Sequence, residues 1–316
     1  MADPSAPVMS PPIGFVLLVN PFNPLAQSER LIRTLNRMFN HPPIACHHDF
    51  GQNPQFIANC PPNVRLVRPH VDTKWADFSC IEAAVRAIQL LYSEANSPDW
   101  FVYLSGSDYP IKPAARILND LQSSPFDTHI EHIPVQRHPP PHSPLEGRLE
   151  GHKGSDWPRV CHRRYCSVPV TIPWITKRLH LTTRTFQLEH PLFTAGRLPF
   201  SPQLRCFAGE AWFCANRRAA GKILDSYARD TKLGDHYRKV LCPEESYFHT
   251  VLANSSDLRL SQDPLRYMDW MASGNHPKIL TMDDLPKLKN SGAHFARKFD
   301  ESKDAAVLSE LDQWIV

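Results

Sequence analysis

The chain has 316 residues, of which 42% are hydrophobic and 21% are charged. This apolar share is enough to bury a sizeable core, which excludes a largely disordered protein. Lys and Arg exceed Asp and Glu by only 35 to 32, so net charge alone does not indicate a nucleic-acid or membrane partner. The 31 prolines, about twice the usual frequency, indicate long stiff loops rather than a helical bundle.

Strand and helix patterns alternate in the first part of the chain. Residues 13–19 form a continuous apolar run with β-branched members, typical of a buried strand in a parallel sheet. Asn23 and Pro24 predict a helix start, because Asn caps helices and Pro fits their first turn. Together with strands and helices further on, this order indicates an α/β fold with a largely parallel sheet. The further strands are expected at 43–48, 64–67 and 100–104, and the further helices at 75–91 and from Pro113.

A loop-rich region follows, from His138 to about Pro202, and it opens with HPPPHSP. Between residues 130 and 190 there are nine Lys and Arg, five acidic residues and seven His. Such a region is usually a solvated surface. Its basic excess could also face an acidic or phosphate-bearing acceptor.

The last third of the chain again has regular patterns. Residues 206–214 are expected to form a strand with a Gly-Glu interruption, and 217–227 a helix. Pro243 and two acidic residues after it predict the start of a helix that runs to about residue 253. Thr281 and Asp284 resemble a capping box. A closing amphipathic helix is expected at 303–316.

Motifs for common cofactors, metals and targeting signals are missing from the sequence. It contains no GxGxxG, no GKS or GKT loop and no CxxC pair, so dinucleotide, P-loop and zinc sites have little support. A metal site made by His47, His48 and Asp49 is disfavoured, because adjacent strand residues point to opposite faces. We expect reduced, mostly buried cysteines, no signal peptide and no membrane anchor.

Polar side chains that could take part in catalysis or binding follow predicted strands or open a helix. Asp49 follows the second strand and Asp108 the fourth, where ligands of open α/β sheets bind. Glu244 and Glu245 open the helix near residue 243, and basic residues gather in FARKFD near the C-terminus. Each group also has a purely structural interpretation, since Asp often caps turns and acidic residues favour a helix N-terminus.

The combination of motifs resembles the core-2/I-branching N-acetylglucosaminyltransferase and peptide xylosyltransferase family, glycosyltransferase family 14. The matching segments run in family order from about residue 14 to 315, and LSGSDYPIK, the helix opened by PEE and FARKF are specific in combination. The matching segments are VLLVNPFNP, HHDFG, KWADFSCIEAA, WFVYLSGSDYPIKP, CFAGEAWFCANRRAAGKIL, CPEESYFHTVLANS, LRYMDW with HPKILTMDDL, and FARKFD.

The resemblance implies a GT-A glycosyltransferase fold, with a Rossmann-like, mostly parallel sheet and helices on both faces. It implies transfer of a sugar from a UDP-sugar to a hydroxyl with inversion and without a metal or other cofactor. A D-x-D motif, which holds the metal in most GT-A enzymes, does not occur in the sequence. After a flexible N-terminus (1–12), a single catalytic domain is expected over 13–316. Its parts are a nucleotide-binding half (13–125), an acceptor-side region (126–205) and a catalytic and phosphate-binding half (206–316).

The resemblance also implies roles for individual residues. Glu245 matches the general base, and Lys298, in FARKF, matches the group that neutralises the leaving diphosphate. Lys278 in HPKIL stands where some relatives have Arg, and Arg297 and Arg266 are further candidates for the same task. The remaining expected contacts are Val19, Asn20, Asp49, Thr73 and Asp108 for the donor and Glu131, Glu210 and Trp212 for the acceptor.

The acceptor and the location of the protein stay open. Family members in eukaryotes are anchored in the Golgi lumen, whereas no anchor is expected here, so a cytoplasmic enzyme of bacterial or viral origin is favoured. A glycan, a small molecule or a hydroxymethylated DNA base could then be the acceptor. The alternatives are a non-catalytic glycan- or nucleotide-binding protein with the same fold and, less well supported without a D-x-D motif, a nucleotidyltransferase.

Overall fold

The structure is a computed structural model that describes residues 11–19, 25–56, 60–94, 96–136, 157–171, 185–194, 196–270 and 276–315. A seven-stranded sheet with the order β12-β6-β11-β4-β1-β2-β3 lies at its centre. β1 pairs in parallel with β2 and β4, and β2 with β3, whereas β11 runs antiparallel to its two neighbours. The expected α/β fold with a mostly parallel sheet is confirmed. The strands are β1 (Ile13–Val19), β2 (Ile44–His48), β3 (Val64–Leu66), β4 (Trp100–Ser105), β6 (Thr128–His129), β11 (Cys214–Asn216) and β12 (Leu260–Ser261).

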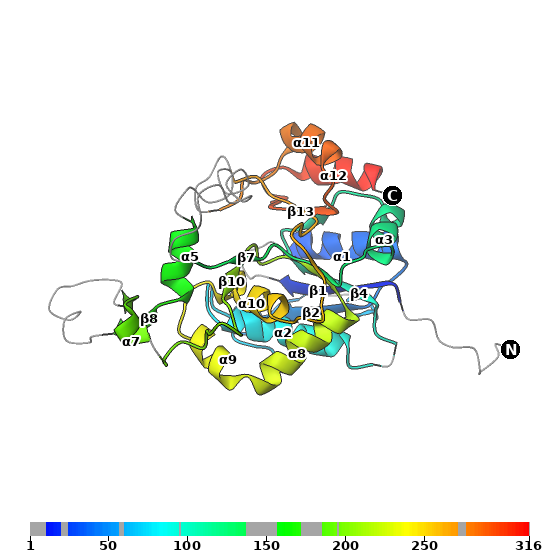
Figure 1. The fold of residues 1–316 in the computed structure, drawn as a ribbon. Helices are drawn as coiled ribbons and strands as arrows, with labels where there is room; N and C mark the ends of the chain where they lie inside the picture. The colour runs from blue at the N-terminus through cyan, green and yellow to red at the C-terminus, as the bar shows by residue number, and fades with distance from the viewer. Residues whose placement is uncertain are drawn as a thin grey trace.

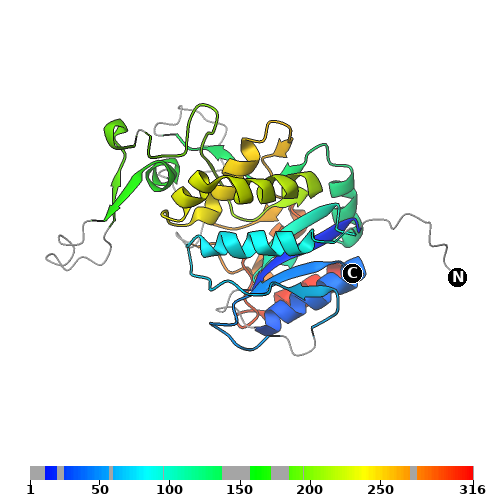
Figure 2. The same ribbon diagram turned by 90° about the horizontal axis from the view of Figure 1, so that it is seen from below.

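Helices cover both faces of the sheet, because the side chains of each strand alternate between two cores (Figure 1). In β1, Phe15 and Leu17 belong to one apolar cluster, and Val16 belongs to the other. The first cluster contains side chains of α1 (Leu25–Phe39), α3 (Ala114–Gln122), α11 (Leu285–Asn290) and α12 (Ala305–Trp314). The second contains side chains of α2 (Ser79–Leu91), α8 (Arg217–Arg229), α9 (Thr231–Tyr237) and α10 (Tyr247–Ala253). Figure 2 shows α2 and α8 side by side across this second face.

Short strands outside the central sheet join segments that are distant in sequence. A three-stranded sheet has the order β13-β14-β5, formed by Arg266–Tyr267, Phe295–Ala296 and Tyr109–Pro110. β7 (Ile133–Pro134) pairs with β10 (Phe207–Ala208). The loop-rich region contains α5 (Trp157–Tyr165), a hairpin of β8 (Val168–Thr171) and β9 (Thr185–Leu188), and α7 (Pro191–Thr194).

Several predicted elements differ in the structure. Residues 206–214 do not form one strand, because β10 and β11 belong to different sheets. The chain between them passes very close to Glu131, and a Cβ atom on Gly209 would lie 2.3 Å from the Glu131 carbonyl oxygen. The helix expected from residue 75 begins at Ser79, after Ala76 adopts a positive φ of 58°.

The helix expected at 243–253 is also divided in two. It consists of a 3-10 turn, η1 (Pro243–Glu245), and then α10, because Ser246 between them leaves helical geometry with a φ of −145°. α9 was not predicted. The capping box of Thr281 and Asp284 is confirmed, and it opens the 3-10 turn η2 (Met282–Asp284) before α11.

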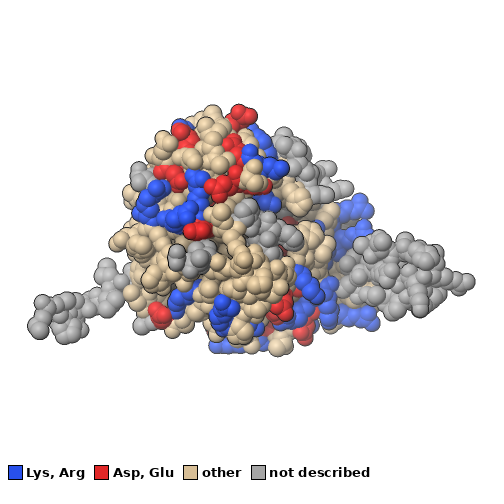
Figure 3. Space-filling view, turned by 180° about the vertical axis from the view of Figure 1, so that it is seen from behind, with Lys and Arg blue, Asp and Glu red and all other residues tan. Residues whose placement is uncertain are grey.

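Charged side chains of both signs are interspersed over α11 and α12 on the face opposite to Figure 1 (Figure 3). Lys289 of α11 lies 3.9 Å from Glu310 of α12, and Arg30 of α1 lies 2.8 Å from Asp312. This part of the surface is therefore neither uniformly positive nor uniformly negative. Within the described part of the chain, no helix combines the length and the apolar character needed to cross a membrane.

Candidate active site at the carboxyl edge of the central sheet

The carboxyl ends of β1, β2 and β4 lie at the same edge of the sheet. The strands are parallel, and their register places Val19 beside His48 and Leu18 beside Ser105. β1 is flanked by β2 on one side and by β4 on the other, which is a topological switch point where ligands of open α/β sheets bind. Val19 at the end of β1, Asp49 directly after β2 and Asp108 in the loop after β4 thus border one edge of the sheet. Asn20 lies outside the described residues.

Asp49 is buried at this edge, where neutral groups of Gly51, Gln52 and Thr73 donate hydrogen bonds to its carboxylate. Its carboxylate accepts hydrogen bonds from the backbone N (2.7 Å) and hydroxyl (2.9 Å) of Thr73. The Gln52 side chain and the backbone N atoms of Gly51 and Gln52 donate three more. Burial alone would raise the pKa of Asp49, but these hydrogen bonds lower it to about 2. Asp49 is therefore a fixed anion that orders the loop carrying Thr73.

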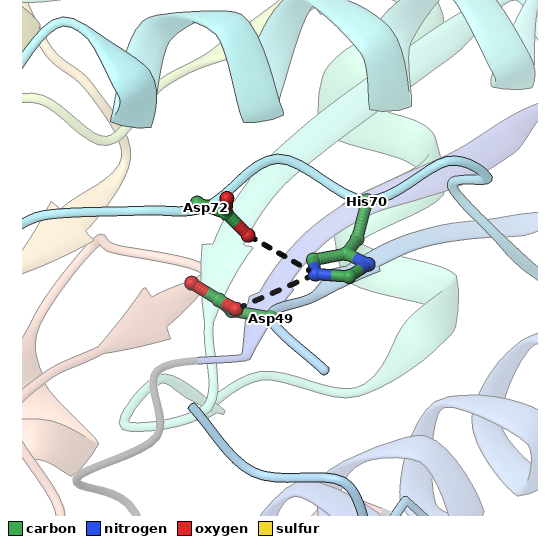
Figure 4. Close-up of side chains that lie close together, drawn as sticks. All are labelled: Asp49, His70 and Asp72. Carbon is green, nitrogen blue, oxygen red and sulfur yellow. Dashed lines mark ion pairs between the residues drawn. The ribbon is translucent and has the colours of Figure 1, made fainter. Parts of the chain in front are cut away.

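His70 and Asp72 approach the same carboxylate (Figure 4). His70 Nε2 lies 3.8 Å from Asp49 Oδ1 and 3.2 Å from Asp72 Oδ1. The three side chains are of the kinds that bind transition metals, and their candidate ligand atoms lie within 4.8 Å of one another. The Asp49 oxygens, however, already accept five hydrogen bonds, and Asp72 is exposed. The arrangement is explained equally well as a hydrogen-bonded loop anchor.

His47 and His48 do not join this cluster. His47 Nε2 accepts a hydrogen bond from the backbone N of Val71, and burial lowers the pKa of His47 to about 4. His48 Nε2 is hydrogen-bonded at 2.8 Å to the carbonyl oxygen of Asn53. Both imidazoles therefore fix the loops around the edge of the sheet.

Asp108 lies in a buried ion-pair cluster. Its carboxylate accepts hydrogen bonds from the backbone N (2.8 Å) and the hydroxyl (2.5 Å) of Ser105. Arg266 Nη1 lies 3.1 Å from Asp108 Oδ1, and neither side chain is exposed. Arg297 Nε lies 3.7 Å from the other oxygen. The β13-β14-β5 sheet explains this meeting, because it joins the strand that contains Arg266 to those adjoining Arg297 and Asp108.

The cluster is not saturated by hydrogen bonds. Arg266 Nε, Arg266 Nη1, Asp108 Oδ1 and Arg297 Nε have no hydrogen-bond partner among the described residues, so the Arg266–Asp108 contact is an ion pair without hydrogen-bond geometry. Burial lowers the pKa of Arg297, and the Asp108 carboxylate opposes that shift. Buried donors without partners are typical of sites that receive a polar ligand or water.

Lys298 follows Arg297 and is half-buried. The backbone N of Phe299 donates to the carbonyl oxygen of Ser107, and the side chain of Gln27 donates to the carbonyls of Gly106 and Phe299. These bonds hold the segment after β14 against the loop after β4. Burial and the charge of Arg297 lower the pKa of Lys298. Its ammonium group forms no hydrogen bond or ion pair with the residues that the structure describes.

Lys278 has a different environment. Its ammonium group lies 2.7 and 2.9 Å from the two carboxylate oxygens of Asp284, which is buried. The same carboxylate accepts a hydrogen bond from the backbone N of Thr281 in the capping box. Lys278 thus stabilises the start of η2, and its charge is already matched by a neighbour.

Glu245 lies at the end of η1. Its Oε2 accepts a hydrogen bond of 2.8 Å from Arg164 Nη1 of α5, and its carbonyl oxygen accepts one from the backbone N of Gly209. Thr250 is buried in α10, where its hydroxyl bonds β10 rather than facing Glu245. Arg164 was missed by sequence reasoning, because it lies in the loop-rich region and stood out only as one of nine basic residues.

The expected acceptor residues adjoin the Asp108 cluster. The backbone N of Glu210 donates to the carboxylate of Glu131 at 3.0 Å, and both side chains are buried. Arg297 stacks on the ring of Trp212, with 4.6 Å from Cζ to the ring centre, and the charge of Glu210 acts on Arg297. The structure therefore brings Glu131, Glu210, Trp212 and Arg297 together.

Comparison with known proteins identifies a family. The family model described as Core-2/I-Branching enzyme matches residues 17–142 and 171–289. Asp49, Asp108 and Glu245 lie inside the match, and Arg164 and Lys298 lie outside it.

Three relatives with assigned names are similar to most of the chain. Beta-glucuronosyltransferase GlcAT14A of Arabidopsis thaliana is 28% identical over 260 residues, which cover 79% of this chain and 50% of the relative. GlcAT14B of the same plant is 25% identical over 257 residues, covering 79% and 51%. Xylosyltransferase oxt of Drosophila melanogaster is 21% identical over 276 residues, covering 80% and 27%. The chain thus spans about half the length of the plant relatives and about a quarter of the insect one. Because the family model covers more than half of its residues, the chain belongs to the Core-2/I-Branching enzyme family.

Proposed function

We propose that the protein is a glycosyltransferase that moves a sugar from a UDP-sugar to an acceptor hydroxyl, with inversion and without a metal ion. Two observations carry the proposal. Asp49 and Asp108 border the same edge of the sheet, and a backbone hydrogen bond from Phe299 to Ser107 holds the segment that contains Lys298 against the loop after β4. The Lys298 ammonium group makes no hydrogen bond or ion pair with the described residues. The names of the relatives, which are glucuronosyltransferases and a xylosyltransferase, agree with sugar transfer.

In the proposed reaction the acceptor oxygen attacks the anomeric carbon from the side opposite to UDP. The new bond forms between these two atoms while the bond from the anomeric carbon to the β-phosphate oxygen breaks. The bonding electron pair leaves with UDP, and the acceptor proton passes to the Glu245 carboxylate. Attack from the opposite side inverts the configuration, and a single carboxylate base is sufficient for it.

The leaving diphosphate needs a positive charge near it in the absence of a metal ion. We assign this role to Lys298, with Arg297 behind it, because the Lys278 charge is already matched by Asp284. Charge-assisted hydrogen bonds to phosphate are short and strong in a site that excludes water. Asp49 and Thr73, with Val19 and Asn20, are proposed to line the nucleotide, and Asp108 to border the transferred sugar.

For the acceptor we propose a hydroxyl-bearing glycan or small molecule that approaches Glu131, Glu210 and Trp212. The relatives give no support to a modified DNA base as acceptor. They come from a plant and animals, so they also give no support to the bacterial or viral origin expected from the sequence. A non-catalytic binding protein with the same fold is the alternative function.

A thermal-shift panel tests the donor. The protein is heated with UDP, UDP-glucuronate, UDP-xylose, UDP-glucose and UDP-N-acetylglucosamine, each with and without EDTA. We expect UDP and one UDP-sugar to raise the Tm equally in both conditions. The best donor is then incubated with candidate acceptors, and UDP release is measured. Release that stops in EDTA and returns with Mn²⁺ contradicts metal independence, and binding without any release supports the alternative.

A further inference from the structure

The helix α5 connects the loop-rich region to the turn that carries Glu245. It is anchored by three buried side chains on one face, Trp157, Cys161 and Tyr165, whose spacing is helical. The Tyr165 hydroxyl donates a hydrogen bond of 2.8 Å to the carbonyl oxygen of Cys242, directly before η1. The carbonyl oxygen of Tyr165 is in turn hydrogen-bonded at 2.8 Å to His236 Nε2 of α9. The C-terminal end of α5 is therefore fixed at Tyr165, directly after Arg164.

This anchoring directs Arg164 to Glu245. Arg164 Nη1 lies 2.8 Å from Glu245 Oε2, and both side chains are 23% exposed. Arg164 Nη1 also lies 3.4 Å from the Tyr165 hydroxyl. The guanidinium group thus contacts the carboxylate and the phenol that holds the start of η1. The exposure is low enough to limit screening by solvent, and it still leaves the pair within reach of a bound substrate.

We propose that Arg164 is a positioning residue for the proposed base: it holds one carboxylate oxygen of Glu245 and so orients the carboxylate toward the acceptor hydroxyl. This inference rests on the proposed function. A carboxylate with both torsions free samples many orientations, whereas one fixed by a short charge-assisted hydrogen bond has a single direction. The logic is that of a base held by a third group, as in catalytic triads.

The charged and titratable groups around Glu245 come from α5 and from the turn η1 with the residue before it. α5 supplies Arg164 and the phenol of Tyr165, and burial together with the charge of Glu245 raises the pKa of Tyr165. η1 itself supplies Glu244, and Cys242 directly precedes the turn. Arg164 is a cation in direct contact with the Glu245 carboxylate, with 2.8 Å between Nη1 and Oε2. Removing Arg164 therefore takes away a positive charge that contacts the carboxylate.

The same helix offers a matched control. Arg163 is adjacent to Arg164 and exposed, and its carbonyl oxygen accepts a hydrogen bond from the hydroxyl of Ser167. Arg163→Met therefore removes the same charge from the same helix without touching Glu245. Arg164→Lys keeps the charge but replaces the fork with a single point charge.

The test measures UDP release by wild type, Arg164→Met, Arg164→Lys and Arg163→Met over a range of pH, with the donor chosen from the panel above. We expect Arg164→Met to lower kcat about 10- to 100-fold. We also expect the acid limb of its pH–rate profile to move up by about one pH unit. Arg164→Lys should recover the position of that limb and part of the rate, and Arg163→Met should match wild type.

Two results would overturn the inference. One is Arg164→Met with the wild-type rate and profile. The other is a loss of rate with an unchanged profile and no rescue by Arg164→Lys, which indicates a purely structural helix contact. If Arg164→Met does not fold, as judged by its Tm, the rates of Arg164→Lys and Arg163→Met decide. The inference predicts a lower kcat for Arg164→Lys and the wild-type kcat for Arg163→Met, and wild-type rates for both overturn it.

Failure of the proposed function has a different signature. Wild type would then release no UDP from any donor and acceptor, and the positioning role would fall with it. If wild type is active and the Arg164 variants have its rate and pH profile, only the inference is overturned.

Discussion

Two aspartates stand at equivalent places, at the carboxyl ends of parallel strands, and they are stabilised in opposite ways. Asp49 accepts hydrogen bonds from neutral donors that are two to 24 residues away in sequence. Asp108 has one neutral neighbour, Ser105, and two guanidinium groups, Arg266 and Arg297, from far along the chain. The first site is local, and the second exists only when the C-terminal segment has joined the sheet.

The difference separates two tasks within one proposed site. A buried carboxylate held by neutral donors keeps its negative charge and orders the loop that carries Thr73, which is proposed to line the nucleotide. A carboxylate paired with two cations leaves a net positive cluster, which suits a diphosphate next to it. The predictions below test whether the two aspartates differ as described.

Removal of Arg266 should have the largest effect on stability. Arg266→Met leaves the Asp108 carboxylate buried, with Arg297 at 3.7 Å as its remaining cation. We expect the free energy of unfolding to fall by about 3–5 kcal/mol, measured by urea denaturation. The exposed Arg259 provides a control, and Arg259→Met should change stability by less than about 0.5 kcal/mol.

The double variant Arg266→Met with Asp108→Asn sharpens the result. Asn can still accept the hydrogen bonds from Ser105, no carboxylate remains buried beside the missing guanidinium group, and Arg297 keeps its stacking contact with Trp212. The double variant should therefore recover more than half of the loss. Additive losses would show that the two side chains do not form the pair described.

The effect of Asp49 on the free energy of unfolding should depend on pH. The pKa of Asp49 is about 2 in the folded protein, below its ordinary value of 3.8. Its contribution is thus fully present above 3.8 and is lost as pH falls through about 2. We expect wild type to lose about 2 kcal/mol more than Asp49→Asn in this window, measured by urea denaturation at each pH. Parallel pH curves for the two proteins would contradict the hydrogen-bonded anion.

The two lysines give the smallest effect and the most specific one. Lys298→Met should weaken UDP binding about tenfold in calorimetric titration, because a charge-assisted contact to phosphate is lost. Lys278→Met should weaken it less, since the Lys278 charge is matched by Asp284, and should instead lower stability by about 1 kcal/mol. The reverse order of affinities would move the phosphate contact to Lys278.

Much of the fold followed from local patterns in the sequence. The apolar run of β1 and the helical spacing in α1 and α2 were sufficient, because burial on both faces of a parallel strand leaves a clear signal. Residues 206–214 misled the prediction, since strands β10 and β11 have only two and three residues, too short for a period to appear. At the break, the Ser246 hydroxyl is hydrogen-bonded to the Tyr237 hydroxyl and the Phe207 carbonyl oxygen, and no local pattern predicts these contacts.

Local patterns likewise predicted only part of the candidate site. Asp49 and Asp108 could be predicted as polar residues after strands, because the edge of a parallel sheet is set by topology. The pairing of Lys278 with Asp284 was not foreseen, although the capping box was, because the ammonium reaches the box from outside the motif. The contact of Arg164 with Glu245 joins segments that no short motif connects.

The rate of UDP release by Glu245→Gln, compared with Glu244→Gln, tests the central proposal most directly. The two residues are neighbours in η1, and both substitutions keep the size of the side chain while they remove the charge. If Glu245 takes the acceptor proton, Glu245→Gln lowers kcat by about 100-fold or more with little change in UDP affinity, and Glu244→Gln stays within a few-fold of wild type. A Glu245→Gln enzyme that works at the wild-type rate would contradict the account.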